Sequence, residues 1–553
     1  MEKTIIYQVL PRLFGNKNEN CIKNGTKEEN GTGKFNDLDN KALGRIRDLG
    51  ATHIWLTGVI RHATQTDYSA YGIPMQNAEV VKGKAGSPYA IADYYDIDPD
   101  LAVEPENRMK EFEDLVTRAH NAGLKVVIDF VPNHVARQYK SICKPEEVED
   151  IGEKDNTSLH FSTDNNFYYC WGNALDLSDI TQGKEQTYQE QPAKATGNDQ
   201  FSNRPSRNDW YETVKLNYGI DYCDAGGRST HFDPIPDTWD KMTTILLFWA
   251  GKGVDAFRCD MAEMVPPAFW TWATDKVKYK YPEMLFIGEV YNPSLYRTYL
   301  ASGFDLLYDK VGMYDTLRHI ICGLRNAGDI TWQWQSTNDI REHMLYFLEN
   351  HDEQRIASDF FAADPYKAIP ALIVSVCMHT NPFMIYCGQE FGEPGMDEEG
   401  FSGVDGRTTI FDYWSVGSIR RGFFDRDKMT SDERTMEQIY KFILQLANDE
   451  KALKEGEFFD LMYMNQHISA KQYAFLRKAD NDLLLVVTNF DEEQAECDIV
   501  IPSHAFDYLN IAEKETEAID LLSGDTYTTA LRSDSAIHVS IPPHSGRILK
   551  FTI

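Results

Sequence analysis

Two charged residues stand near the end of an apolar segment of the chain. The segment "GVDAFRCD" carries Arg258 and Asp260 two positions apart, and its remaining residues are typical of a buried strand. Residues i and i+2 of a strand point to the same face, so the arginine and the aspartate are expected to stand side by side. Such a pair, taken alone, is typical of a structural ion pair. Other segments end in the same way, which favours a chemical role.

Three further apolar segments end in polar residues. "DFVPNH", "IGEV" and "LENHDEQR" supply Asp129, Asn133 and His134, then Glu289, then His351, Asp352 and Arg355. Carboxylates that lie close together divide their roles, because like charges push their pKa values apart and leave one group protonated. Glycoside hydrolysis needs this combination, with one carboxylate as nucleophile or base and one carboxylic acid for the leaving oxygen. In this interpretation Arg258 keeps Asp260 ionised and oriented.

The elements that position these residues follow from the apolar segments. Strands are predicted over residues 4–10, 52–57, 125–131, 254–259, 284–290, 304–308, 344–349 and 382–386. Helical patterns such as residues 108–123 lie between them, which predicts parallel β-α-β units. Eight strands with no polar alternation favour an α/β fold of the closed (β/α)8 TIM-barrel type, and a doubly wound open sheet is the alternative. In such a barrel, the carboxyl-terminal strand ends form one rim, where active sites lie.

Two parts of the chain do not follow the barrel pattern. Residues 135–237 show little helical periodicity and are too long for a plain loop, so they are predicted to form an inserted domain after the third strand. Residues 455–553 contain short alternating strands, two of them joined by the turn Asp480-Asn481, and predict an antiparallel β-sandwich. The barrel itself is then expected to occupy residues 1–134 and 238–454.

Composition excludes several classes of partner. The chain has 55 Lys and Arg residues against 86 Asp and Glu residues, a net charge of −31 that repels phosphate backbones and anionic membranes. Nucleic acid and membranes are therefore not expected as partners. The nine cysteines are scattered without a CxxC pair, so neither a zinc site nor a disulfide framework is predicted. Reduced thiols and the lack of a recognisable secretion signal at the start of the sequence predict a cytoplasmic location.

Taken together, these segments resemble the α-amylase family of retaining glycosidases, glycoside hydrolase family 13. "VVIDFVPNH", "DAFRCDMAE", "FIGEV" and "LENHDEQR" are similar to its four signature regions and occur in the same order. "IIYQVLPRLFG" resembles its first barrel strand, and "GSPYAIADYYDIDPDLA" resembles the segment before its second helix. The inserted region resembles its domain B, and the sandwich resembles its domain C.

The resemblance implies a role for each matching residue. Asp260 would be the nucleophile, Glu289 the general acid and base, and Asp352 the residue that binds hydroxyls of the distorted sugar. The supporting and sugar-binding residues would be Arg258, which orients Asp260; Asp129, which positions Arg258; Arg355; His134 and His351, which bind the same sugar; and Tyr89, its stacking platform. Pro88 replaces the usual glycine before that tyrosine.

The sequence departs from the family pattern after the nucleophile. Glu263 and Met264 stand where many α-amylases carry Lys-His, whose lysine binds sugar and whose histidine helps to hold calcium. Glu263 is interpreted either as an influence on the acceptor side or as a solvated glutamate of the rim. Asn133 matches another common calcium position, so a structural calcium ion is an open alternative, and the chemistry requires no cofactor.

The expected activity is hydrolysis of α-1,4 bonds in maltooligosaccharides or starch-derived glucans, with retention of configuration through a covalent intermediate. The carboxyl groups of the acid and the nucleophile are then expected to lie about 5–5.5 Å apart. The alternative is a glucanotransferase or maltosyltransferase of the same family, and a lesser one is a non-catalytic sugar-binding relative. The expected partner is an α-glucan, and no motif addresses the oligomeric state.

Overall fold

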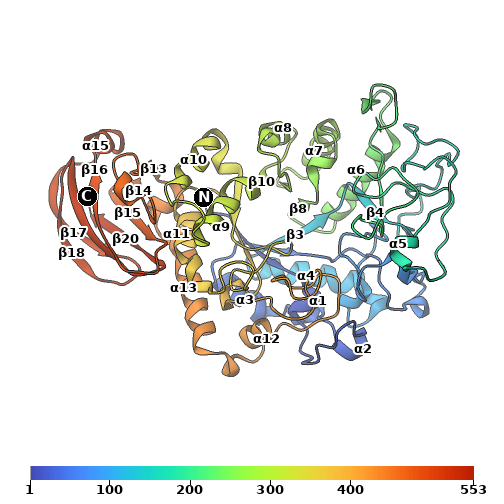
Figure 1. Ribbon diagram of the computed structural model, residues 1–553, viewed down its shortest axis with the longest axis horizontal. Helices are drawn as coiled ribbons and strands as arrows, with labels where there is room; N and C mark the ends of the chain where they lie inside the picture. Colours follow the sequence, from blue (N-terminus) through green and yellow to red (C-terminus); the bar gives the residue numbers. More distant parts are fainter. Residues whose placement is uncertain (1, 553) are drawn as a thin grey trace.

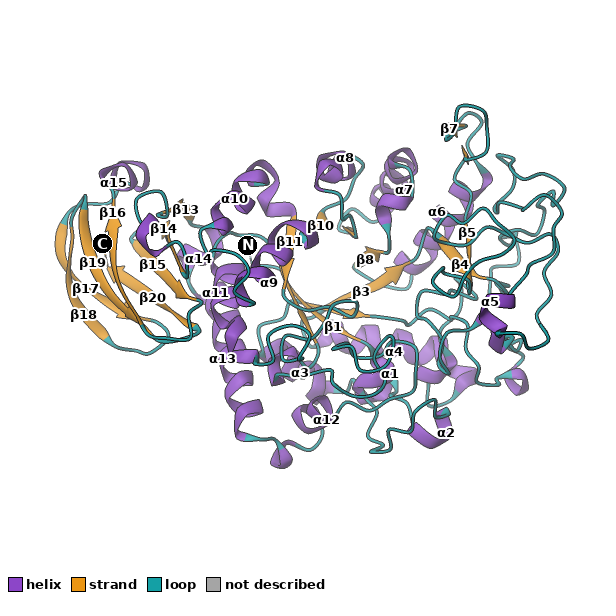
Figure 2. Ribbon diagram, viewed as in Figure 1, coloured by secondary structure: helices purple, strands orange, loops and turns teal. Residues whose placement is uncertain are grey.

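The computed structural model describes residues 2–552, and a closed barrel of eight parallel strands forms its centre (Figures 1 and 2). The barrel strands are β1 (Ile5–Val9), β2 (His53–Leu56), β3 (Lys125–Phe130), β8 (Ala256–Cys259), β9 (Leu285–Gly288), β10 (Leu306–Tyr308), β11 (Met344–Phe347) and β12 (Phe383–Tyr386). They pair in chain order, and β1 closes the ring by pairing with β12, with Ile5 opposite Phe383. The eight predicted strands are confirmed, and the open-sheet alternative is wrong.

Both faces of the barrel strands are buried, which explains their continuous apolar pattern. Alternate residues fill the interior of the barrel, where they pack against one another: Ile6, Trp55, Val127, Ala256, Ile287, Tyr308, Leu345, Phe347 and Met384. The residues between them point outward into a second, larger core beneath the surrounding helices. The barrel is therefore a packed core, and ligands have access only at its ends.

Helices surround the barrel and connect its strands. They are α1 (Pro11–Phe14), α2 (Lys27–Asn30), α3 (Asn40–Asp48), α4 (Arg108–Asn121), α6 (Asp237–Ala250), α7 (Pro267–Lys280), α8 (Tyr296–Ala301), α9 (Asp315–Ile321), α10 (Asp329–Ser336), α11 (Ile369–Cys377), α12 (Gly417–Phe423), α13 (Ser431–Asp449) and α14 (Lys451–Glu455). A capping box formed by Thr430 and Glu433 starts α13, the longest of them. Within residues 2–552, no helix is both long and apolar enough to cross a membrane.

The chain between β3 and α6 is an insertion with little regular structure. It contains α5 (Ser178–Thr181) and two short ribbons, β4 (His134–Ala136) with β5 (Thr213–Lys215), and β6 (Ile220–Asp221) with β7 (Ser229–Thr230). Figure 1 shows it at one end of the molecule, with the C-terminal strands at the other. Because β4 begins four residues after β3 ends, the first ribbon carries the insertion directly from the barrel rim.

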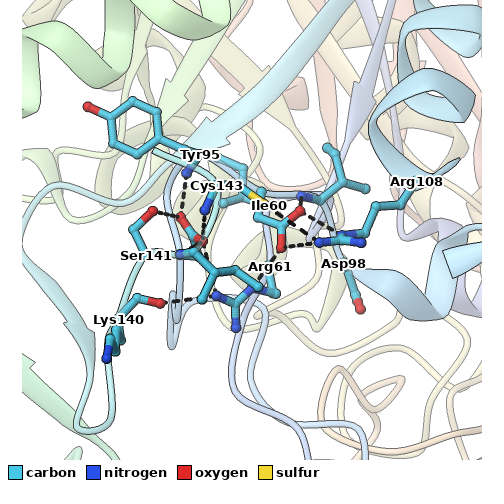
Figure 3. A network of polar contacts seen from close by, with 12 residues as sticks. Ile60, Arg61, Tyr95, Asp98, Arg108, Lys140, Ser141 and Cys143 are labelled. Atoms are coloured by element: carbon cyan, nitrogen blue, oxygen red, sulfur yellow. Dashed lines mark hydrogen bonds and ion pairs between the residues drawn. The ribbon is translucent and has the colours of Figure 1, made fainter. Parts of the chain in front are cut away.

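A buried polar network ties the start of the insertion to the barrel (Figure 3). Arg61, in the loop after β2, contacts Asp93 at 3.1 Å and Asp96 at 3.0 Å. Arg108, the first residue of α4, binds Asp96 through two nitrogens at 2.6 and 2.9 Å. Ser141 of the insertion donates to Asp93 at 2.6 Å. Two arginines thus neutralise two buried aspartates where three segments of the chain meet.

The last hundred residues form two antiparallel sheets. One has the order β13-β14-β15-β20-β17-β18, and β16 pairs with β19 in the other. The elements are β13 (Glu457–Asp460), β14 (Gln472–Ala479), β15 (Asp482–Asn489), β16 (Ala495–Ile501), α15 (Ser503–Leu509), β17 (Lys514–Asp520), β18 (Thr526–Leu531), β19 (Ser535–Ile541) and β20 (Ser545–Thr552). β14 and β15 form the predicted hairpin, and Asp480 in its turn has a φ of +48°.

Candidate active site

Arg258 is the centre of a cluster of carboxylates at the carboxyl-terminal rim of the barrel. Its side chain is 1% exposed, and one terminal nitrogen donates to Asp260 at 2.9 Å and to Asp129 at 3.4 Å. The other terminal nitrogen lies 2.9 Å from Glu289. The sequence placed Arg258 and Asp260 on one face of a strand, and the structure adds that one guanidinium binds two of the predicted catalytic carboxylates.

The backbone at the end of β8 turns sharply and brings Asp260 and Glu289 together. Met261 adopts a left-handed conformation, with a φ of +43°, which is costly for a residue with a side chain and is typical of functional sites. Its N–H donates to Glu289 Oε2 at 2.8 Å, and the hydroxyl of Tyr291 donates to Glu289 Oε1 at 2.7 Å. Glu289 therefore has both oxygens bound and a fixed orientation.

A chain of hydrogen bonds crosses the barrel from β1 to Asp129. Gln8 donates through Nε2 to His351 Nδ1 at 2.7 Å, so the ring proton of a neutral His351 is on Nε2. That nitrogen lies 2.5 Å from the hydroxyl of Tyr89, which in turn lies 3.4 Å from Asp129. The rings of Tyr89 and His351 are stacked, with centroids 5.3 Å apart. Despite Pro88, Tyr89 stands among the predicted site residues.

The rim surrounds a cavity of about 350 Å³, enough to enclose part of a sugar chain. The three predicted catalytic carboxylates line it, together with Tyr89 and His134. Side chains outside the predicted catalytic and sugar-binding set complete the wall: Lys82, Ser87, Trp210, Glu212, Thr213, Met261, Tyr291, Phe401, Ile410 and Phe411. Aromatic faces among polar groups suit sugar rings, whose apolar faces stack while their hydroxyls form hydrogen bonds.

Burial and mutual repulsion raise the pKa values of three clustered carboxyls, those of Asp260, Asp352 and Asp129. Burial raises the pKa of Asp260 well above its ordinary value, and Glu289 raises it further, while Arg258 opposes both effects. The pKa of Asp352 rises to about 7, first through burial and then through Glu289. Burial also raises the pKa of Asp129 to about 6, again against the effect of Arg258. The cluster therefore retains protons near neutral pH, and these belong to the coupled groups together.

The two predicted sugar-binding histidines are neutral. Burial lowers the pKa of His134 to about 3, and the positive charge of Lys215 lowers it further. The pKa of His351 lies well below its ordinary value because of burial and then of Arg258. Neutral imidazoles can donate hydrogen bonds to hydroxyl groups without adding a buried charge.

Arg355 lies apart from the carboxylate cluster. It binds Glu349 at 2.9 Å and donates to the carbonyl oxygen of Cys387 at 3.0 Å and to Thr408 at 3.0 Å. These contacts connect the end of β11 with the segments after β12. The predicted supporting role of Arg355 is therefore one of holding loops beside the site.

The surroundings of Asn133 do not fit the calcium ion that the sequence left open. Its Oδ1 accepts a hydrogen bond from the ammonium of Lys215 at 2.8 Å, so a cation already holds the oxygen that would bind the metal. Calcium takes six to eight oxygen ligands. Two groups elsewhere in residues 2–552 bring three ligand atoms together: Asp93, Asp96 and Cys143, where the arginines of Figure 3 bind the carboxylates, and Asp221, Asp224 and His231 near the β6–β7 ribbon.

Glu263, one of the departures from the family pattern, holds a loop. Its Oε2 accepts the backbone N–H groups of Tyr291 at 3.2 Å and Asn292 at 3.0 Å. The carboxylate thus fixes the segment after β9 that presents Tyr291 to Glu289. The sequence gives no sign of this role for Glu263, because the contact joins the segments after two different strands, β8 and β9.

A parallel barrel with paired carboxylates on an arginine at its rim is the arrangement expected of an enzyme that acts on glycosidic bonds. The model of the α-amylase catalytic domain matches residues 8–453, and that of the α-amylase C-terminal all-beta domain matches residues 463–552. The chain belongs to the α-amylase family and is a glycoside hydrolase. Catalysis in this family requires no cofactor.

Known relatives share the architecture at low sequence identity. α-Amylase 3 of Dictyoglomus thermophilum is 22% identical over 550 residues, which cover 96% of this chain and 93% of the relative. Neopullulanase 2 of Thermoactinomyces vulgaris is 21% identical, with 89% of this chain and 70% of the relative covered. The crystal structure of the maltogenic α-amylase AmyB from Thermotoga neapolitana superposes with a TM-score of 0.64 at 19% identity, covering 100% and 99% of the two chains. The fold is shared along the whole chain.

Proposed function

We propose that this enzyme hydrolyses α-1,4-glucosidic bonds of maltooligosaccharides or starch-derived glucans with retention of configuration. One observation carries the proposal: Asp260 and Glu289 bind the two terminal nitrogens of Arg258, and Asp352 lines the same cavity. The relatives that carry the name α-amylase support this choice of substrate. The nine free thiols support the cytoplasmic location expected from the sequence, which is part of the proposal.

The first half of the proposed reaction forms a covalent intermediate. When the coupled cluster carries its proton on Glu289, Asp260 is ionised and attacks the anomeric carbon. Glu289 gives that proton to the glycosidic oxygen, so the bond to the leaving sugar breaks as the ester to Asp260 forms. Arg258 stabilises the attacking carboxylate, and Met261 N–H and Tyr291 hold Glu289 in place. The shared proton of the cluster supplies the acid that this step needs.

The second half returns the enzyme to its starting state. Glu289 removes a proton from water, whose oxygen attacks the anomeric carbon from the opposite side and releases Asp260. Two inversions give net retention. Asp352 would bind hydroxyls of the distorted sugar, while Tyr89 offers its ring face and His134 and His351 offer hydrogen bonds.

The decisive experiment is a product analysis of purified protein with maltoheptaose, beside the Glu289→Gln variant. We expect only shorter sugars from the wild type. Glu289→Gln should lower turnover by a factor of about 10²–10⁴ while calorimetry still detects sugar binding, because only the proton transfer is lost. Glu283→Gln, an exposed glutamate before β9, is the matched control and should keep full activity.

Each other result has a definite meaning. Products longer than the substrate would identify a glucanotransferase that resolves the same intermediate with a sugar acceptor. Undiminished turnover in Glu289→Gln would remove Glu289 as the acid. Sugar binding by the wild type without any turnover would point to the non-catalytic alternative.

A further inference from the structure

Lys215 buries an ammonium group where the insertion leaves the barrel. The side chain is 2% exposed, and Lys215 lies opposite His134 in the β4–β5 ribbon. Its Nζ lies 2.8 Å from Asn133 Oδ1 and 2.6 Å from Asp199 Oδ1. The ring of Tyr222 lies 5.7 Å away, within cation–π range. An unpaired buried ammonium is costly, so these contacts indicate a built site for the charge.

The ammonium determines which way the amide of Asn133 faces. An ammonium can only donate, so the atom that faces it must be the amide oxygen. The amide nitrogen of Asn133 then donates to the carbonyl oxygen of Gly197 at 2.8 Å and to His134 Nδ1 at 3.2 Å. Because Nδ1 accepts, the proton of neutral His134 is on Nε2, and the ring with this tautomer lines the cavity.

We propose that Lys215 is the resident cation of this junction, that it takes the place of a metal ion at Asn133, and that it positions His134 for substrate. The part that concerns His134 rests on the proposed function. The ammonium joins Asp199 of the insertion to Asn133, three residues after β3. It therefore closes the insertion onto the barrel and also fixes the tautomer of His134. A divalent cation could not approach the amide oxygen without displacing Lys215.

The first test uses the unaltered full-length protein and needs no activity. The melting temperature is measured after dialysis against EDTA and again with added calcium chloride, and bound metal is measured by mass spectrometry. We expect the same melting temperature in both buffers and no calcium retained in proportion to the protein. A fall with EDTA that calcium reverses, and that persists in Asp224→Asn, would overturn the proposal, because a metal would then hold the junction and not the Asp221–Asp224–His231 group.

The second test asks whether Lys215 acts through His134. Lys215→Met keeps the length of the side chain and removes the charge, and we expect kcat/KM to fall by about tenfold, mainly through a higher KM. In a His134→Ala background the same change should cost less than about twofold, because the residue that Lys215 positions is gone. Equal losses in both backgrounds would contradict a positioning role.

A control and an independent readout complete the design. Lys184→Met removes an exposed lysine of the same insertion and should leave kcat/KM unchanged. If Lys215→Met does not fold, the EDTA and calcium measurements on the wild type still decide which cation is resident. If the wild type cleaves no glucan, the proposed function fails, while those same measurements still decide the assignment of the cation.

Discussion

At the scale of residues, the main feature of the site is an excess of negative over positive charge. Four carboxylates, Asp129, Asp260, Glu289 and Asp352, surround a single guanidinium, that of Arg258, and the two nearby histidines are neutral. One positive charge cannot balance this many negative charges, so Asp129, Asp260 and Asp352 keep protons to higher pH than isolated carboxyls do. In the proposed mechanism a retained proton serves as the acid, so we expect the activity to be sensitive to charges just outside the cavity.

Two neighbours of Asp352 test this sensitivity in opposite directions. Glu353 raises the pKa of Asp352 and Arg407 lowers it, while burial keeps it near 7. We expect Glu353→Gln to move the alkaline limb of the pH profile of kcat/KM to lower pH by about 0.5, and Arg407→Met to move it to higher pH by a similar amount. Asp359→Asn, at an exposed position, is the control. Movement of both variants in the same direction would contradict the shared-proton account.

The residues of the site were predictable to different degrees. Asp260, Glu289 and Asp352 follow strand ends, so a parallel barrel brings them to one rim without further information. Gln8, which binds His351, and Tyr308, whose hydroxyl accepts from Arg258 Nε at 3.2 Å, were missed. Both are polar residues inside apolar strands, which is the kind of indication that selected Arg258. The contacts of the insertion, such as those of Lys215, depend on loops. Loop sequences have no periodic pattern of apolar residues, so the sequence does not predict these contacts.

At the scale of elements, the barrel meets the C-terminal sheets around a buried arginine. Arg477 of β14 is fully buried and donates to three carbonyl oxygens, those of Cys377 at 2.9 Å, Leu453 at 3.0 Å and Gly456 at 2.8 Å. Cys377 ends α11, and Leu453 and Gly456 lie at the end of α14. A cation there satisfies carbonyls that a helix end leaves without partners and complements the negative ends of both helix dipoles.

Removing that cation should loosen the contact between the two parts. Arg477→Met leaves three carbonyls without their donor, two of them on buried residues, and we expect the free energy of unfolding to fall by about 3 kcal/mol. Urea denaturation followed by tryptophan fluorescence would measure it. Lys478→Met, at the next position, should change stability by no more than about 0.5 kcal/mol. A loss no larger than in this control would show that Arg477 does not support the contact.

The elements of the fold were predictable wherever periodicity governs them. The barrel strands are buried on both faces, and α4 and α13 carry one apolar face each, so the sequence shows their type and approximate position. The β14–β15 hairpin follows from its two-residue turn. For the insertion, the sequence predicts only that one is present. Its ribbons β4–β5 and β6–β7 are too short to produce a recognisable pattern of apolar residues.

At the scale of the molecule, stability depends on buried groups that titrate in opposite senses. The buried carboxyls Asp98 and Asp309 have a pKa of about 6, so they bind protons more tightly in the folded state and lose stabilising effect as pH rises through that value. Buried His53 and His62 have pKa values of about 4 and 3, so they add stability as pH rises through the unfolded value near 6.5. The loss from the carboxyls offsets the gain from the histidines. The free energy of unfolding of the wild type should therefore vary little over the pH range in which both groups titrate.

A single substitution separates these opposed effects. Glu390 is buried between the hydroxyl of Tyr7 and the N–H of Gly388, and burial raises its pKa to about 7. Its folded pKa exceeds its unfolded value, so the stability it contributes is present at low pH and is lost as pH rises through 7. Glutamine stays neutral and can keep both contacts. We therefore expect the free energy of unfolding of Glu390→Gln, relative to that of the wild type, to rise by about 1 kcal/mol between pH 6.5 and 8.

The difference between the two proteins isolates one ionisation from all the others. The histidines and the remaining carboxyls titrate equally in wild type and variant, so their contributions cancel when the two free energies of unfolding are subtracted at each pH. Urea denaturation at four pH values between 6.5 and 8 gives that difference, and Glu185→Gln, at an exposed position, should show none of it. A difference that stays constant or falls with pH would mean that Glu390 is already ionised in the folded protein at pH 6.5.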